Sequence, residues 1–485
     1  MTTRGFRRTV VLTIVALGLA PALPAGAQEW SRFRGPNGSG LSGTEGLPVD
    51  FGPATNVVWK TTLPVGYSSP ILAGHRIFVT ALRDETLLTI CLDRRDGRVL
   101  WEREAPRPRR EKLDPRNHPA APSVATDGER AVVFFADFGM LAYDLDGNEL
   151  WRLPLGPFNN IYGMGASPIL VGDLAVLVVD QSTHSYILAV DKRTGREIWR
   201  TDRPEAKSGH STPIVYQPNE GPLQILVPGS FQLTSYAADT GRKLWWVRGL
   251  SFELKSVPVI EGDTLYINGF GAPDNQPGRQ VPAPPFEEVL AARDADKDGR
   301  LSKTEMPDQR TQSYVDVIDL DQSGLVDAEE WNYFRALSAS ENGMLAIRLG
   351  GDGDVTATNV RWRYHRSVPQ LPSPLVYEGV LYMVNDGGIV TSLDPATGET
   401  VKQGRLKGAI DRYYASPVAA DGKIYMVSEK GLVAVLPPDG SLEPIAVNDL
   451  GENCYATPAL ADGRIYLRTV NTLYAFGKKG DGGIF

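Results

Sequence analysis

Cysteine, histidine, basic charge and long hydrophobic runs are all scarce in this 485-residue chain, and each scarcity excludes a class of protein. Two cysteines cannot build a disulfide framework or a thiolate zinc site, and five histidines, none three or four residues apart, give no zinc pattern. Basic residues number 50 against 58 acidic ones, a net charge of −8, which argues against nucleic-acid binding. Beyond the first 27 residues no segment approaches the ~18 uninterrupted apolar residues of a membrane span. A hydrophobic content of 42% is that of a globular protein.

Residues 1–27 have the pattern of a cleavable signal peptide. Arg4, Arg7 and Arg8 precede a short apolar run, and Ala25 and Ala27 form an A-x-A cleavage pattern. We therefore expect cleavage after Ala27 and a periplasmic or secreted mature protein. Sec and twin-arginine export both stay open.

A small residue followed by proline recurs along the chain. Successive prolines lie 41 to 52 positions apart, with one longer interval of 116, so eight units fit. The dipeptides are Ser69-Pro70, Ala121-Pro122, Ser167-Pro168, Thr212-Pro213, Val257-Pro258, Ser373-Pro374, Ser416-Pro417 and Thr457-Pro458.

Each unit contains four short runs rich in β-branched and aromatic residues, separated by turns at Gly, Asp or Asn. The third unit reads SPILVGDLAVLVV, YILAVD and, after Thr194-Gly195, REIW. Helical periodicity is absent from the units. The sequence therefore predicts an all-β, eight-bladed β-propeller formed by residues 28–271 and 343–485.

Tryptophans mark the last strand of most units. Trp59 has the same setting but precedes the first unit, and the eighth unit is one strand short. We therefore expect the N-terminal strand to complete blade eight and close the ring. The rings should wedge between neighbouring blades. Units six and seven have Lys402 and Ile445 at this place and should dock differently.

The segment AVDKRTGREIW (189–199) resembles the tryptophan-docking motif of the pyrroloquinoline-quinone (PQQ)-type propeller repeat family. CLDRRDGRVLW (91–101) and SLDPATGE (392–399) are partial copies, and WSRFRGPNGSG (30–40) is similar to the start of exported bacterial propellers of this family. The resemblance covers nearly the whole mature chain. It implies either a quinoprotein alcohol dehydrogenase or a non-catalytic member, such as the lipoprotein that assists outer-membrane β-barrel assembly.

Two features separate this sequence from the dehydrogenases that it resembles. Those enzymes carry adjacent cysteines over the quinone, whereas Cys91 and Cys454 are 363 positions apart. The carboxylates that hold calcium against the quinone have no counterpart that we can match. A Cys91–Cys454 bridge stays open.

The long interval holds an insertion, residues 272–342, with two twelve-residue EF-hand patterns. Alternate short acids on a tight loop converge on one Ca²⁺ ion, Gly299 and Gly324 make the sharp turn, and a backbone carbonyl serves at position 7. The ligands at positions 1, 3, 5, 7, 9 and 12 are Asp294, Asp296, Asp298, Arg300, Ser302 and Glu305 in the first loop, and Asp319, Asp321, Ser323, Leu325, Asp327 and Glu330 in the second.

The two loops should pair through a short β contact at Leu301 and Val326. Pro307 truncates the helix after the first loop, so we expect a compact, stable pair rather than a sensor that opens widely. The insertion holds 15 acidic and 7 basic residues. Without metal the loops should repel each other's charge. The repeat pattern places the insertion between the second and third strands of blade five, where it should cap or flank the channel mouth.

The same face receives the residues just before each repeat proline. Convergence there can form a ligand or peptide site, although hydrogen-bonded channel lining is the simpler explanation. The candidates are Tyr67, His118, His210, Lys255, Arg412, Tyr413, Tyr414 and Tyr455. The basic segment 107–116 is expected to be a solvated loop, with binding of an anionic partner as the alternative.

These observations favour an exported, calcium-binding, monomeric propeller that binds a protein, small-molecule or glycan ligand without catalysis. The alternative is a PQQ- and calcium-dependent alcohol or sugar dehydrogenase.

Overall fold

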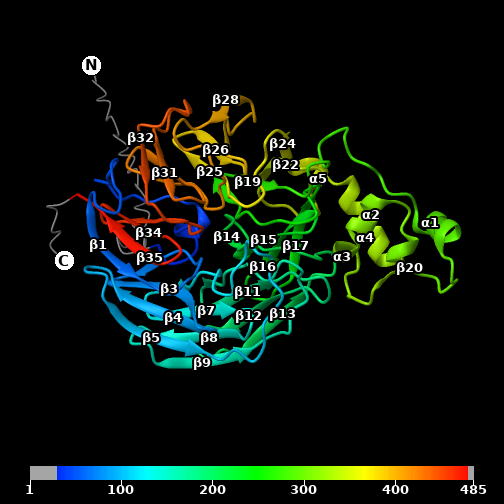
Figure 1. The fold of residues 1–485 in the computed structure, drawn as a ribbon, viewed down its shortest axis with the longest axis horizontal. Helices are drawn as coiled ribbons and strands as arrows, with labels where there is room; N and C mark the ends of the chain where they lie inside the picture. The colour runs from blue at the N-terminus through cyan, green and yellow to red at the C-terminus, as the bar shows by residue number, and fades with distance from the viewer. Residues whose placement is uncertain (1–29, 479–485) are drawn as a thin grey trace, which may run out of the picture.

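The computed structural model describes residues 30–478, so the expected signal peptide lies outside the described residues. Eight antiparallel sheets stand around a central axis (Figure 1), which confirms the eight-bladed β-propeller. Seven sheets have four strands and one has a fifth. None of the helices in residues 30–478 is long and apolar enough to cross a membrane.

Blades 1 to 4 follow one another along the chain, each from its inner to its outer strand. Their strands are β2 (Ile71–Ala73), β3 (Arg76–Arg83), β4 (Thr86–Asp93) and β5 (Val99–Ala105); β6 (Ala125–Thr126), β7 (Arg130–Phe135), β8 (Gly139–Asp144) and β9 (Glu149–Pro154); β10 (Ile169–Val171), β11 (Leu174–Val179), β12 (Tyr186–Asp191) and β13 (Glu197–Asp202); and β14 (Ile214–Tyr216), β15 (Gln224–Gly229), β16 (Gln232–Ala237) and β17 (Lys243–Arg248), with β23 (Gly353–Asp354) added beside β17.

Blades 5 to 8 complete the ring. Their strands are β18 (Val259–Glu261), β19 (Thr264–Gly269), β22 (Gly343–Arg348) and β24 (Val360–Tyr364); β25 (Leu375–Tyr377), β26 (Val380–Val384), β27 (Ile389–Leu393) and β28 (Thr400–Arg405); β29 (Val418–Ala420), β30 (Lys423–Val427), β31 (Leu432–Leu436) and β32 (Ala446–Asp449); and β33 (Ala459–Ala461), β34 (Arg464–Arg468), β35 (Thr472–Phe476) and β1 (Val57–Thr62).

The N-terminal strand closes the ring, as the short eighth unit predicts. β1 pairs antiparallel with β35, with Trp59 opposite Ala475. Blade 8 is therefore built from both ends of the described chain, which lie side by side (Figure 1). This pairing gives β35 its fourth-strand partner and holds the first and last blades together.

Middle strands are buried on both faces because each blade lies between two others. All six residues of β7 and all six of β16 are buried. This explains why runs such as AVVFF lack the alternation of a half-exposed strand. Outer strands such as β13 alternate instead, with only Trp199 fully buried.

Five tryptophan rings dock onto the following blade in one common way. The indole N–H donates to a backbone carbonyl of the next blade at 2.9–3.1 Å. Each ring also covers a glycine in the turn before that blade's outer strand, and these glycines have positive φ. The pairs are Trp59 with Gly97, Trp101 with Gly147, Trp151 with Gly195, Trp199 with Gly241, and Trp362 with Gly398.

Trp245 is buried in a cluster that spans blades 4 and 5, as expected of a ring wedged between blades, but its hydrogen bond departs from this arrangement. Its N–H donates to Gln224 Oε1 of its own blade at 2.9 Å. Blade 5 has no Thr-Gly turn to receive the ring. Its third and outer strands are joined instead by a segment that contains β23 and α5 (Thr356–Asn359), and β23 pairs with β17.

Blades 6 and 7, which lack the tryptophan, dock by other contacts. Ser392 Oγ donates to the Gly440 carbonyl at 2.9 Å, and the Gly440 N–H donates to the Tyr382 hydroxyl at 3.0 Å. Between blades 7 and 8, the N-terminal Phe51 packs against Tyr425 and Phe476. The expectation that these blades dock differently is therefore confirmed.

The second repeat is shifted by two residues from its predicted position. Ser123-Val124 precedes β6 as Ser69-Pro70 precedes β2. Ala121-Pro122 is therefore not the equivalent dipeptide, and that assignment is wrong. Val124 occupies the position that proline has in the other blades, and the nearby Pro122 gave the wrong alignment.

Residues 30–42 bind to the inner strands of several blades at one end of the central channel. Arg32 donates to the Pro213 carbonyl and Arg34 to the Pro374 carbonyl, while Asn37 pairs with both backbone groups of Val215. η1 (Pro36–Gly38) lies in this segment. The N-terminal segment thus binds backbone groups at the inner strands of blades 4 and 6.

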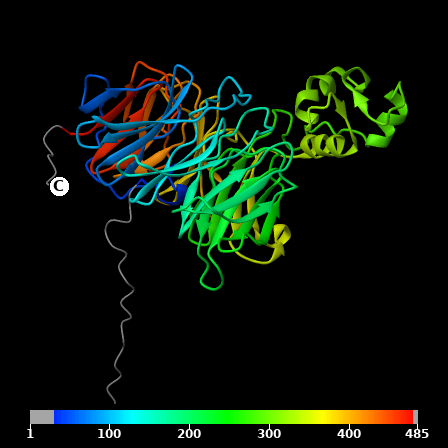
Figure 2. The same cartoon turned by 90° about the horizontal axis from the view of Figure 1, so that it is seen from below.

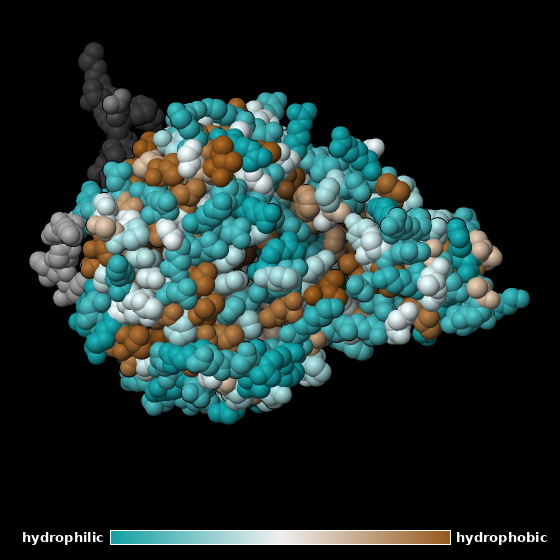
Figure 3. Space-filling model, viewed as in Figure 1, coloured by the Kyte–Doolittle hydropathy of each residue, from teal (hydrophilic) through white to brown (hydrophobic). Residues whose placement is uncertain are grey.

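The insertion between β19 and β22 folds into a small helical unit with its own core. It comprises α1 (Phe286–Arg293), β20 (Leu301–Ser302), η2 (Lys303–Glu305), α2 (Gln309–Ser313), α3 (Val315–Ile318), β21 (Leu325–Val326) and α4 (Ala328–Ala339). It projects sideways from the rim rather than covering the channel (Figures 1 and 2). Its surface is largely hydrophilic, whereas hydrophobic residues are scattered over the propeller face (Figure 3).

Candidate functional site

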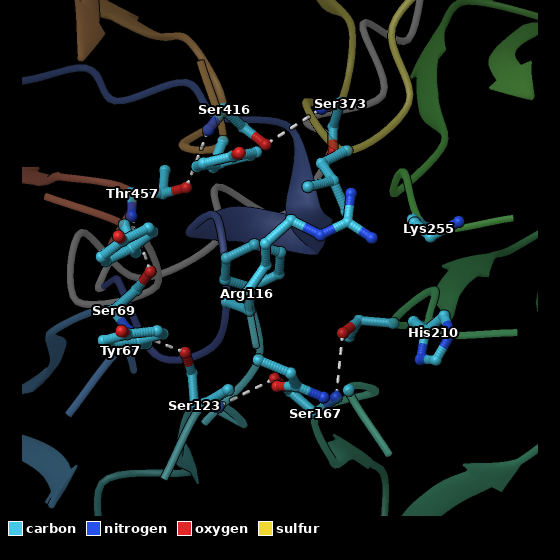
Figure 4. A pocket seen from close by; sticks show the side chains of 18 of the residues that line it. Tyr67, Ser69, Arg116, Ser123, Ser167, His210, Lys255, Ser373, Ser416 and Thr457 are labelled. Atoms are coloured by element: carbon cyan, nitrogen blue, oxygen red, sulfur yellow. Dashed lines mark hydrogen bonds between the residues drawn. The ribbon is translucent and has the colours of Figure 1, made fainter. Parts of the chain in front are cut away.

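A cavity of about 240 Å³ occupies the channel at the face where one blade connects to the next. Phe33 of the N-terminal segment is among the residues that line it, as are residues of the segments that enter the inner strands (Figure 4). We call this cavity the mouth pocket. Five of the predicted candidates line it: Tyr67, His210, Lys255, Tyr414 and Tyr455.

The repeated small residue before each inner strand forms a ring of hydrogen bonds around this pocket. The backbone N–H of one blade donates to the side-chain hydroxyl of the next at 2.9–3.1 Å, and seven such bonds run around the channel (Figure 4). Val257 of blade 5 has no hydroxyl, so one bond is missing. We call the seven hydroxyls the hydroxyl belt: Ser69, Ser123, Ser167, Thr212, Ser373, Ser416 and Thr457.

Three tyrosines form one wall of the mouth pocket. Tyr67 and Tyr455 stack with ring centroids 4.2 Å apart, and Tyr414 stacks on Tyr455 at 5.8 Å. Burial raises the pKa of Tyr67 and of Tyr455, so both hydroxyls are protonated at neutral pH. This wall is an uncharged stack of aromatic rings that cover one another's faces.

Arg116 lies across the middle of the pocket and was not predicted (Figure 4). Its guanidinium binds Asp114 through two contacts of 2.8 and 3.0 Å, and this hydrogen bonding lowers the pKa of Asp114. The segment 107–116 is a loop, as expected, and the side chains of Arg110 and Arg116 are exposed. Arg107 pairs with Asp137, and the side chain of Arg107 is only 12% exposed.

The buried carboxylate of Glu253 lies in another wall of the pocket. Glu253 accepts from His210 at 3.0 Å and from Ser208 at 2.7 Å, and it pairs with Lys255. Burial opposes ionisation, but Lys255 and His210 keep the pKa of Glu253 below its usual range. The carboxylate of Glu253 therefore neutralises the charge of Lys255.

Three predicted candidates lie outside the lining. His118 stacks behind Tyr67 with ring centroids 4.8 Å apart. Tyr413 is fully buried and donates to the Ala409 carbonyl at 2.6 Å, and the Arg412 side chain is exposed. Tyr162, Glu253, Asp114 and Arg116 line the pocket without having been predicted. Their segments also lead into inner strands, and that shared position could have identified them.

The acidic loops of the insertion gather their carboxylates as the spacing predicts. Carboxylate oxygens of Asp294, Asp296 and Glu305 lie within 4.8 Å of one another, and so do those of Asp319, Asp321 and Glu330. Leu301 pairs with Val326 in a short antiparallel contact between the loops, which confirms that expectation. Gly299 and Gly324 have φ of 81° and 83°, a conformation that favours glycine.

The last glutamate of each loop points into its own loop. Glu305 accepts from the backbone N–H groups of Ala295 and Ser302, each at 2.8 Å. The Ser302 hydroxyl is the largest of the contributions that lower the pKa of Glu305 to about 2. Glu330 accepts from the N–H of Leu320 at 2.7 Å and from that of Asp327 at 3.0 Å.

The second loop lies against the propeller. The Leu320 carbonyl accepts from Asn159 at 2.7 Å, and Lys207 pairs with Glu329 at 2.9 Å. On α4, Tyr333 packs edge-on against Phe231 and belongs to a buried cluster with Phe252. Phe252 precedes Glu253 of the mouth pocket, so one short segment contacts both the insertion and the pocket.

The two cysteines do not form a bridge. Cys91 and Cys454 are both free and buried, and burial raises the pKa of each thiol to about 12. Cys91 packs as a small apolar side chain in blade 1, and Cys454 Sγ donates to the Arg468 carbonyl at 3.0 Å.

The comparisons with known proteins agree on the fold. BamB from Moraxella catarrhalis is 12% identical, with a TM-score of 0.50 over 82% of this chain and 96% of that one. A europium-containing methanol dehydrogenase is 9% identical, with a TM-score of 0.59 over 94% and 99%. The quinohemoprotein alcohol dehydrogenase of Comamonas testosteroni is 11% identical, with a TM-score of 0.55 over 94% and 81%. At these identities the likeness concerns the fold alone.

No curated protein matches this sequence. A family model does: the model described as outer membrane protein assembly factor BamB matches residues 52–186 and 183–482. These matches span most of the chain and include all eight blades. The chain therefore belongs to this family of PQQ-like β-propellers.

Proposed function

We propose that this protein is an exported, calcium-binding β-propeller that binds a protein or small-molecule ligand at its mouth pocket without catalysing a reaction. The observation that carries the proposal is the state of the pocket's carboxylates. Asp114 is engaged by Arg116, and Glu253 by Lys255 and His210. A general base needs a free lone pair near the substrate and a pKa near the working pH, and neither carboxylate offers both. Export rests on the pattern of residues 1–27.

Calcium is the metal that fits the acidic loops. Asp294 Oδ1 is buried and has no hydrogen-bond partner among the described residues, so a ligand position in the first loop is unfilled by protein. All the side-chain donors are oxygens, which hard divalent cations prefer. The six residues predicted in each loop would supply them, with the carbonyls of Arg300 and Leu325 at position 7.

Calcium would also join the insertion to the propeller more firmly. The insertion carries eight more acids than bases, and two Ca²⁺ ions would cancel half of that excess. Glu330 belongs to the second loop and is buried, and burial raises its pKa. Because Leu320 and Glu329 of this loop and helix contact the propeller, ordering the loop orders that interface.

The residues of the mouth pocket do not fit PQQ with an adjacent calcium ion. Among residues 30–478, the side-chain groups that could hold a metal are the two loop clusters, which lie in the insertion. The two carboxylates in the pocket already have cationic partners, and no cysteine lines it. The mouth pocket therefore lacks the side chains that would hold this cofactor with its calcium ion.

Calorimetric titration with Ca²⁺ tests the metal sites. We expect about two sites per chain. Glu305→Gln and Glu330→Gln should each weaken one site by at least about tenfold, because the glutamate supplies two of the ligand oxygens. Glu288→Gln, on the exposed face of α1, is the matched control and should bind as the wild type does. Unchanged binding in the double variant would refute the calcium assignment.

Reconstitution with PQQ and Ca²⁺ tests the absence of catalysis. We expect no stoichiometric quinone absorbance and no dye-linked oxidation of alcohols or sugars. Stoichiometric quinone binding with turnover would replace this proposal by the oxidoreductase alternative.

A further inference from the structure

The hydroxyl belt offers an unusual concentration of hydrogen-bond donors to whatever occupies the mouth pocket. Each belt hydroxyl accepts one backbone N–H, and none of the seven donates to another described residue. A hydroxyl has one proton and two lone pairs, so each retains an O–H that can point into the pocket. Accepting a bond polarises the hydroxyl and strengthens it as a donor. The ligand that satisfies this ring must carry several oxygen atoms.

The tyrosine wall adds a second requirement. Tyr455 is stacked between Tyr67 and Tyr414 with interplanar angles of 22° and 20°, so the rings cover one another's faces and leave their edges to the pocket. Phe33 adds another aromatic side chain to the lining. A ligand that only accepts hydrogen bonds leaves Phe33 and the apolar ring edges uncovered. The same ligand must therefore also present apolar C–H groups.

The charge of the pocket argues against an ionic ligand. Arg116 is neutralised by Asp114, and Lys255 by Glu253. An anion would enter with no unpaired cation to compensate its loss of hydration, and the reverse holds for a cation. The paired groups still present donors and acceptors side by side, which suits neighbouring hydroxyls on one ligand.

We propose that the mouth pocket binds a neutral saccharide. A sugar ring combines several hydroxyls at its edge with an apolar C–H face, and it carries no charge. The C–H groups would lie against Phe33 and the edges of the tyrosine stack, and the ring hydroxyls would accept from the belt and bridge the Arg116–Asp114 pair. This assignment rests on the proposed function and names the ligand class for the same pocket.

Calorimetry on the full chain tests the ligand class with defined probes. The neutral probes are glucose, galactose, N-acetylglucosamine and maltose, and the charged probes are glucuronate and inorganic phosphate. We expect at least one neutral probe to bind with 1:1 stoichiometry. Replacing a neutral sugar by its charged counterpart should weaken binding at least tenfold.

Variants at the central tyrosine assign binding to this pocket. Tyr455→Ala should weaken binding at least tenfold because it removes the central ring of the stack, whereas Tyr455→Phe keeps that ring and should stay within about threefold of the wild type. Calcium titration and thermal unfolding of both variants show whether the fold is intact. Tyr377→Ala, at a partly buried tyrosine that does not line the pocket, is the matched control.

The possible outcomes distinguish a failure of the saccharide assignment from a failure of the proposed function. Tight binding of phosphate or glucuronate that is lost in Tyr455→Ala would overturn the saccharide assignment and leave a ligand-binding pocket. Binding of none of the six probes would overturn the saccharide assignment, while the calcium and quinone experiments judge the proposed function independently. Sugar binding that Tyr455→Ala leaves unchanged would place the sugar elsewhere and overturn the assignment.

Discussion

His118 shows how a single side chain can make the fold sensitive to pH. Its ring is largely buried behind Tyr67, and Nδ1 accepts the backbone N–H of Ala120 at 3.1 Å, which requires the neutral ring at that nitrogen. Burial, with smaller contributions from Arg468 and Arg107, lowers the pKa of His118 to about 4 from the ordinary 6.5. Between pH 6.5 and about 4, His118 therefore binds a proton in the unfolded chain but not in the folded chain.

We predict that His118 makes the free energy of unfolding fall as the pH drops from 7 to 4, by up to about 3 kcal/mol. His118→Gln keeps an acceptor but cannot be protonated. The difference in the free energy of unfolding between wild type and variant should therefore shrink as the pH falls. Urea unfolding at several pH values measures it. His184→Asn, at an exposed histidine, should follow the wild type. Parallel curves for wild type and His118→Gln would contradict the prediction.

The site residues that the sequence missed share a physical reason. Tyr67 and Tyr455 were found because they lie next to the repeated dipeptide, whereas Arg116 lies seven residues before Ser123. The distance along the chain did not reveal that its segment folds back over the channel. Glu253 was missed because its environment is made by Lys255, by His210 and by Ser208 of the preceding link. Only the assembled ring brings these groups together.

At the scale of elements, the turn before each outer strand joins one blade to the next. In blade 3, Gly195 has φ of 71°, and a Cβ added there would lie 2.7 Å from the ring of Trp151. Gly172, in another turn of the same blade, has φ of 57° but no atom within 4 Å of such a Cβ. The two glycines separate the cost of backbone conformation from the cost of crowding the ring.

We predict that Gly195→Ala destabilises the protein by roughly 2–4 kcal/mol, about 1 from the left-handed backbone and the rest from displacing Trp151. Gly172→Ala should cost only about 1 kcal/mol. Chemical denaturation compares them, and the Trp151 fluorescence should change in the first variant alone. Equal losses in the two variants would show that ring docking at Gly195 contributes nothing.

The strands were predictable because each blade repeats the same local pattern, and the exceptions arise where tertiary contacts replace that pattern. Trp245 has the sequence setting of its counterparts but meets a blade without the receiving turn. In blade 2, Val124 stands where other blades have proline, so the hydrogen bond to Ser123 defines the register and the proline does not. Spacing predicts the number of units, while backbone bonding decides their alignment.

At the scale of the whole molecule, the propeller and the insertion have separate hydrophobic cores. The insertion's core includes Trp331 and Phe334, and a smaller cluster around Tyr333 and Phe252 joins it to the rim. The sequence predicted the insertion and its position in blade 5, because the acidic loops interrupt a strongly repeated pattern. It left open whether the insertion caps or flanks the mouth, since that depends on side-chain contacts such as Phe231 with Tyr333.

The geometry of blade 5 allows the independence of the two parts to be tested. Gly269 at the end of β19 pairs directly with Gly343 at the start of β22, as the two ends of a hairpin do. Replacing residues 270–342 by Asn-Gly, which favours the tight turn of such hairpins, should therefore leave blade 5 intact.

We predict that this deletion variant folds with the circular dichroism of a β protein and loses its calcium binding. Its free energy of unfolding should fall by only about 1–3 kcal/mol, because Phe231 and Phe252 lose their apolar cover. The full chain with Glu305→Gln and Glu330→Gln is the control, since it loses the metal but keeps that cover. Calorimetric titration and thermal unfolding compare the two. If the deletion variant lost cooperative unfolding while the control kept it, the insertion would belong to the folding unit of the propeller, and the separate cores would not mean separate stability.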